Sequence, residues 1–125
     1  MTYNEDLDFE ISFYESLLKD NPNFVDALIA LGDMYTKGGY YKKGLEVDLK
    51  LSKLRPQNPT VYYNLACSYS LLKKSDECIA ALERGIELGY RDFEFMEQDC
   101  DLSFIRKDPR YQELISRYIK NKADS

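Results

Sequence analysis

The sequence predicts an all-α fold of about seven helices, in which antiparallel helix-turn-helix hairpins stack as repeats. The first observation is a period of 34 residues, since a shift by that length brings Pro22 onto Pro56 and Tyr35 onto Tyr69. A fixed period of this size is typical of helical repeat arrays. The second is that apolar residues recur three and four positions apart, as on one face of a helix, whereas strand-like alternation is absent.

The predicted helices cover about residues 7–19, 24–37, 41–54, 60–72 and 76–88, then a short helix near Phe93, Phe95 and Met96, an irregular stretch over 99–107 and a last helix from Pro109. Residues 1–6 are polar and are expected to lie outside the first helix. Pro22 ends that helix, because proline disfavours helix in the residue before it. Gly38-Gly39 and Gly89 end the second and fifth helices through left-handed turns. Pro59 and Asp108 mark helix starts.

Size, charge and composition narrow the class of protein. The 125 residues fit one domain, with 44% hydrophobic and 31% charged residues, as in ordinary folded chains. A net charge of −5 argues against a nucleic-acid partner, because nucleic-acid binders carry basic patches. No apolar run approaches the roughly 18 residues of a membrane span, and the N-terminus does not resemble a signal peptide. We therefore expect a cytoplasmic protein that does not bind membranes.

Catalytic and metal-binding motifs are missing. There is no histidine, and the three cysteines are Cys67, Cys78 and Cys100, without a C-x-x-C pair. Lack of histidine removes the commonest general base and the commonest zinc ligand. Asp99, Asp101 and Ser103 are spaced like the start of a calcium loop, but the downstream glycine and glutamate are missing. We predict a protein that is not an enzyme and holds no metal or cofactor.

These features resemble tetratricopeptide repeats, a family whose 34-residue units place small residues where two helices touch. Gly32 and Ala66 fit the small slot of the first helix, and Gly44 and Cys78 fit that of the second. The resemblance covers two repeats, 25–58 and 59–92, preceded by a half repeat over 8–24 and followed by capping helices over 93–125. It implies a single domain, 1–125, folded as a short right-handed α-solenoid. One departure is Tyr90, which replaces the second closing proline.

The run from Asp99 to Leu114 resembles a C-terminal extension that follows many bacterial tetratricopeptide arrays, which suggests a bacterial source. An end unit of a solenoid exposes an apolar flank that must be covered. We expect Phe104, Ile105, Tyr111 and Leu114 to cover it.

The resemblance also implies that the first helix of each unit lines a concave face that binds another protein. The candidate groove residues are Asp26, Ile29, Asp33, Lys37, Thr60, Tyr63, Asn64 and Cys67. Such a groove favours a neutral or basic extended segment or helix. Tyr63 is the expected apolar anchor, and Asp26 and Asp33 are expected to select positive charge. The alternative is that these are solvated surface residues.

One known binding mode of the family is disfavoured. Chaperone-binding members hold a C-terminal carboxylate with basic residues and asparagines, and only Asn64 matches here. Ile29, Glu94 and Gln98 stand at the basic positions, and Asp33 replaces an asparagine. Carboxylates at these places would repel a carboxylate ligand.

A structural alternative is self-association into a homo-oligomer through the ends of the array. An uncovered terminal unit lets units of different chains stack. The leading half repeat would favour this if Phe9, Phe13 and Tyr14 formed an exposed face.

Overall fold

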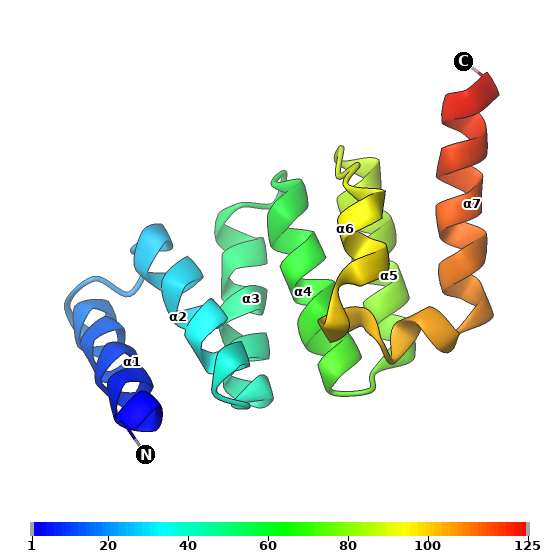
Figure 1. Ribbon diagram of the computed structural model, residues 1–125. Coiled ribbons are helices and arrows are strands. Elements are labelled where there is room, and N and C mark those ends of the chain that lie inside the picture. The colour runs from blue at the N-terminus through cyan, green and yellow to red at the C-terminus, as the bar shows by residue number, and fades with distance from the viewer. Residues whose placement is uncertain (1, 125) are drawn as a thin grey trace.

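The computed structural model describes residues 2–124, and the surroundings of side chains from 6 to 119. Within this range the elements are α1 (Thr2–Asp20), α2 (Val25–Lys37), α3 (Tyr41–Leu54), α4 (Pro59–Leu71), α5 (Ser75–Glu87), α6 (Phe93–Gln98), two 3-10 turns, η1 (Cys100–Leu102) and η2 (Ile105–Lys107), and α7 (Pro109–Asp124). Helices α1 to α5 stand side by side in one row, each packed on the next (Figure 1). The predicted all-α solenoid of stacked hairpins is confirmed. None of the described helices is both long and apolar enough to cross a membrane.

The first helix starts earlier than expected. It begins at Thr2, so the expectation that residues 1–6 lie outside it was wrong for residues 2–6, and residue 1 lies outside the described part. Nothing in the sequence interrupts a helix here, because the first proline is Pro22 and the first glycine is Gly32. Once a helix has nucleated, each further residue adds a hydrogen bond at little cost, so it extends.

The turns of the two repeats are equivalent in backbone conformation. Gly39 has a φ of 82°, and Lys73, which lies 34 residues later, also adopts a positive φ of 60°. After them the Tyr40 amide donates to the Tyr35 carbonyl at 2.8 Å, and the Lys74 amide donates to the Tyr69 carbonyl at 2.9 Å. These bonds satisfy carbonyls at the ends of α2 and α4. The repeat geometry thus imposes a left-handed turn even where glycine is absent.

Close helix contacts occur at the small residues that the sequence singled out. A methyl group on Gly32 of α2 would lie 3.3 Å from Cγ1 of Val47 on α3, and one on Gly44 would lie 3.4 Å from the Thr36 hydroxyl. In the second hairpin the Cys78 thiol donates to the Ala66 carbonyl at 3.2 Å, and both residues are fully buried. Small side chains therefore set how closely the helices of each hairpin approach.

The C-terminal segment covers the flank of α5, as expected. Ile105, Tyr111 and Leu114 are buried in one cluster with Leu82 and Ile86 of α5. Phe104 was expected in the same role, and this was wrong, because its side chain is 37% exposed. It lies between the two 3-10 turns, where the neighbouring Ile105 takes the inward position.

Helix α3 buries a carboxylate among its apolar residues. Its apolar pattern predicts Leu45, Leu49 and Leu51 as inward residues, and of these Leu51 is buried, Leu45 packs partly buried against the core and Leu49 is 37% exposed. The buried residues are Gly44, Val47, Asp48 and Leu51, which recur three and four positions apart. The carboxylate of Asp48 therefore lies on the interior side of α3, and the neighbouring Leu49 lies on the more exposed side.

Replacement of a core leucine should show how much the packing of α5 contributes to the free energy of unfolding. Leu82→Ala removes a side chain that is 1% exposed, and we expect a loss of about 2–5 kcal/mol in the free energy of unfolding. Leu49→Ala, at the exposed position on α3, is the matched control and should cost less than about 1 kcal/mol. Urea denaturation measures both. Equal losses in the two variants would contradict the burial described here.

Candidate functional site

A cavity of about 460 Å³ opens between the first helices of the two repeats. We call it the groove pocket. Its side chains include Ile29 and Asp33 of α2, Asp48 of α3, Tyr63, Asn64 and Cys67 of α4, and Phe95, Asp99 and Asp101 from the C-terminal segment. Side chains from the first hairpin, from α4 and from the C-terminal segment therefore enclose one space. The shape arises because the α6–η1 connection crosses beside α4 (Figure 1).

The structure brings together five of the eight candidate groove residues. Ile29, Asp33, Tyr63, Asn64 and Cys67 all line the pocket. Asp26, Lys37 and Thr60 are exposed and lie outside its lining. Lys37 instead pairs with Asp33 at 2.9 Å, one helical turn away on the exposed surface of α2. Contact of these residues with a partner stays a prediction.

Tyr63 is not the accessible anchor that we expected. Its side chain is only 4% exposed. The ring stacks on that of Tyr90 with centroids 4.4 Å apart, and its hydroxyl donates to Asp99 Oδ2. The expectation was wrong because Tyr90 and Asp99, both distant in sequence, cover the ring. Tyr63 therefore shapes the pocket wall instead of projecting toward a partner.

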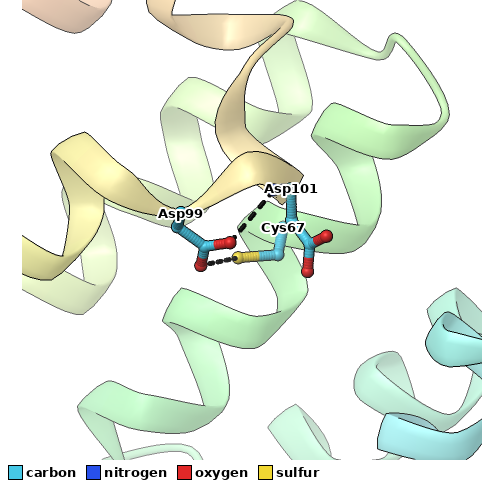
Figure 2. A group of neighbouring side chains, drawn as sticks. All are labelled: Cys67, Asp99 and Asp101. Carbon is cyan, nitrogen blue, oxygen red and sulfur yellow. Dashed lines mark hydrogen bonds between the residues drawn. The ribbon is translucent and has the colours of Figure 1, made fainter.

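Asp99 is the centre of a small cluster with Cys67 and Asp101. Figure 2 shows its two oxygens bonded in different directions, one to the Cys67 thiol at 3.8 Å and the other to the Asp101 backbone amide at 3.0 Å. Burial, together with the charges of Asp99 and Asp101, raises the pKa of the Cys67 thiol well above its usual value. The thiol thus stays protonated and donates to the carboxylate. This argues against Cys67 as a reactive nucleophile, which is a thiolate.

The same cluster is the candidate metal site among the described residues. One ligand atom from each of Cys67, Asp99 and Asp101 lies within 4.8 Å of the others. However, both Asp99 oxygens already accept hydrogen bonds, and a metal would need the thiol to lose its proton. The expected lack of a metal remains a prediction.

Asp48 is a pocket residue that the sequence analysis missed. It is 7% exposed, and the Ser68 hydroxyl of α4 donates to its Oδ2. Burial raises the pKa of the Asp48 carboxyl to about 6. The signal available in the sequence was its spacing, because Asp48 lies three residues before Leu51 and four after Gly44 on a core-facing stripe.

The charged residues that line the pocket are all acidic. Four carboxylates line it, from Asp33, Asp48, Asp99 and Asp101, and no lysine or arginine occurs among the lining residues that the structure describes. The pKa of Asp101 is raised, first by burial and then by the charges of Asp99 and Asp33. The carboxylates from α2 and from the C-terminal segment therefore act on each other across the pocket. Such a site attracts positive charge.

Comparison with known proteins supports a repeat architecture. Residues 59–88 match the family model described as tetratricopeptide repeat. The chain is 33% identical over 90 residues to a chloroplastic protein of Arabidopsis thaliana, covering 70% of this chain and 27% of that protein. It is 34% identical over 77 residues to the "Peroxisomal targeting signal receptor" of Pichia angusta, covering 62% of this chain and 14% of that protein. The chain thus corresponds to a small part of either relative.

Solved structures resemble the whole chain in fold. MamA 41-end from Desulfovibrio magneticus RS-1 superposes with a TM-score of 0.75 at 20% identity, covering 99% of this chain and 71% of that one. A further MamA crystal structure gives a TM-score of 0.70 at 24% identity, covering 92% of this chain and 66% of that one. At such low identity the likeness concerns the fold alone.

Protonation of Asp48 should make stability depend on pH. Its native pKa of about 6 lies above its ordinary value of 3.8, so between these values the folded state binds more protons than the unfolded state. Stability then falls as pH rises through this window. Between pH 7 and pH 4 the wild type should gain up to about 3 kcal/mol of unfolding free energy relative to Asp48→Asn. Urea denaturation of both proteins measures this difference, and a difference that does not change with pH would contradict a raised pKa.

Proposed function

We propose that this chain, a tetratricopeptide repeat protein, is a protein-interaction scaffold that binds a neutral or basic segment of a partner protein in the groove pocket. The observation that carries the proposal is the four-carboxylate lining of a cavity between successive first helices. Opposite charge steers such a segment to the site and sets its register.

Apolar and polar groups around the pocket support a peptide segment as the occupant. Ile29 is 48% exposed and Phe95 is 49% exposed, so each offers apolar surface beside the carboxylates. Asn64 is also exposed, and its amide can both donate to and accept from a peptide backbone. Mixed apolar and hydrogen-bonding surface of this kind is how grooves hold extended or helical segments. In this function the chain acts as an adaptor without a catalytic step. We also propose that it acts in the cytoplasm.

Site-specific photo-crosslinking tests the proposed face. A photo-reactive amino acid in place of Asn64 should capture the partner in cells that express the chain, because position 64 faces the pocket. The same amino acid in place of Glu46, an exposed residue of α3 outside the pocket lining, is the control and should capture little. Mass spectrometry of the adduct identifies the bound segment. Capture of the same partner with equal yield from both positions, or from position 46 alone, would place the interaction elsewhere.

Self-association is a second candidate, favoured by the exposed side of α1. Phe9 is 73% exposed and Phe13 is 52% exposed, whereas Tyr14 on the neighbouring stripe is half-buried and packs against the core. Phe9 and Phe13 lie one helical turn apart, so they offer neighbouring apolar surface that a second copy would cover. In this function the α1 faces of two copies would cover each other.

Light scattering during size-exclusion chromatography tests this candidate. Self-association predicts a mass that rises with protein concentration and returns to that of the monomer in Phe9→Ser/Phe13→Ser. Both positions are exposed, so the substitutions should leave the fold intact. A monomer mass at every concentration removes the candidate and leaves the groove proposal untouched.

A further inference from the structure

We propose that the groove pocket accepts one arginine side chain, and that the partner segment is therefore recognised through an arginine. This inference rests on the proposed function, because it assumes that a protein segment occupies the groove. It goes further by naming the residue that the segment must present.

The carboxylates surround the pocket from different elements. Asp33 lies on α2, Asp48 on α3, and Asp99 and Asp101 on the C-terminal segment. They belong to one space of about 460 Å³, many times the roughly 30 Å³ that a water molecule takes up in the liquid. The pocket therefore has room for a long side chain, with acceptors on more than one side of it.

Two of these carboxylates have oxygens without a donor. Asp48 is 7% exposed and its Oδ2 accepts from Ser68, but no hydrogen bond within the described part of the chain reaches its Oδ1. The half-buried carboxylate of Asp101 accepts none from the described residues either. These oxygens are not among the fully buried polar atoms of the described residues that lack a partner, so solvent reaches them in the free protein. A ligand that brings N–H groups into the pocket would replace that solvent with charge-assisted hydrogen bonds.

The arrangement suits a guanidinium better than an ammonium group or a metal ion. A guanidinium carries five N–H donors in one plane, and it stacks on aromatic rings. The carboxylates lie on separate elements, and the half-exposed ring of Phe95 lines the same pocket. Lysine offers a compact, strongly hydrated charge instead. A divalent ion needs free oxygens close together, but both oxygens of Asp99 are already hydrogen-bonded.

A small probe tests the inference on the isolated chain. N-acetyl-arginine methylamide has uncharged ends and presents the arginine side chain alone, and its citrulline counterpart has nearly the same shape without the charge. In NMR titrations the arginine probe should shift the backbone amides of Asn64, Phe95 and Asp101 saturably. The citrulline probe should bind at least about tenfold more weakly, because charge-assisted hydrogen bonds are lost.

Charge-neutralising variants supply the matched controls. Asp101→Asn should weaken the arginine probe by at least about tenfold, since it removes a pocket charge with little change of shape. Asp33→Asn should weaken it less, because Asp33 already pairs with Lys37 at 2.9 Å. Asp20→Asn removes the same charge at an exposed residue outside the pocket and should leave the affinity within about twofold.

Three results would overturn the arginine assignment. They are the lack of a saturable shift, equal affinity for the corresponding lysine probe, and binding of Mg²⁺ or Ca²⁺ at the same amides in place of the arginine probe. The crosslinking experiment separates this failure from that of the proposed function. If position 64 captures a partner but the arginine probe does not bind, the groove function stands and only the arginine assignment falls. If position 64 captures nothing, the proposed function itself falls.

Discussion

The carboxylate of Asp99 joins the repeat stack to its C-terminal segment, and the shape of the groove pocket depends on it. One oxygen accepts from the Tyr63 hydroxyl and the Cys67 thiol of α4, and the other accepts from the backbone amide of Asp101. A charged acceptor with several donors forms stronger hydrogen bonds than a neutral one. These bonds hold η1 against α4, and the pocket lies beside this junction. Together with the fully buried side chains of Met96 and Leu102, they place Asp101 and Phe95 at the pocket.

Burial of the pocket carboxylates lowers the stability of the fold, and the apolar core around them offsets this loss. Asp48 and Asp101 are both partly removed from water, and the pKa of each is raised by that burial. Burial of a charge without a partner opposes folding. The apolar cluster of α4, α5 and the capping segment is extensive, with Leu82, Ile86 and Tyr111 almost fully buried. A fold of this kind can retain carboxylates that weaken it, and sites at which local rules are broken are where function is expected.

Local patterns in the sequence sufficed to predict the helices and most of their ends, although not the start of α1. Pro59 begins α4, Asp108 caps α7 through the Arg110 amide, and Gly39 closes α2, each through a property of that residue type alone. The site was predicted only in part. The repeat register predicted Ile29, Asp33 and Asn64 at the groove, and all three line the pocket, whereas their contact with a partner stays a prediction. Tyr63 was misjudged because its exposure depends on Tyr90 and Asp99, and no periodic pattern shows which distant residues will cover a side chain.

The sequence by itself thus determined that the chain is a stack of helical hairpins with small residues at the contacts and a capping segment at one end. These properties follow from helix periodicity, turn chemistry and the 34-residue repeat, which act over a few turns of chain. Only the tertiary structure decided which carboxylates meet in one pocket and that Asp48 is among them. The reason is that desolvation and charge interaction depend on distances between residues far apart in sequence, as between Asp33 and Asp101, and these distances exist only after the helices have packed.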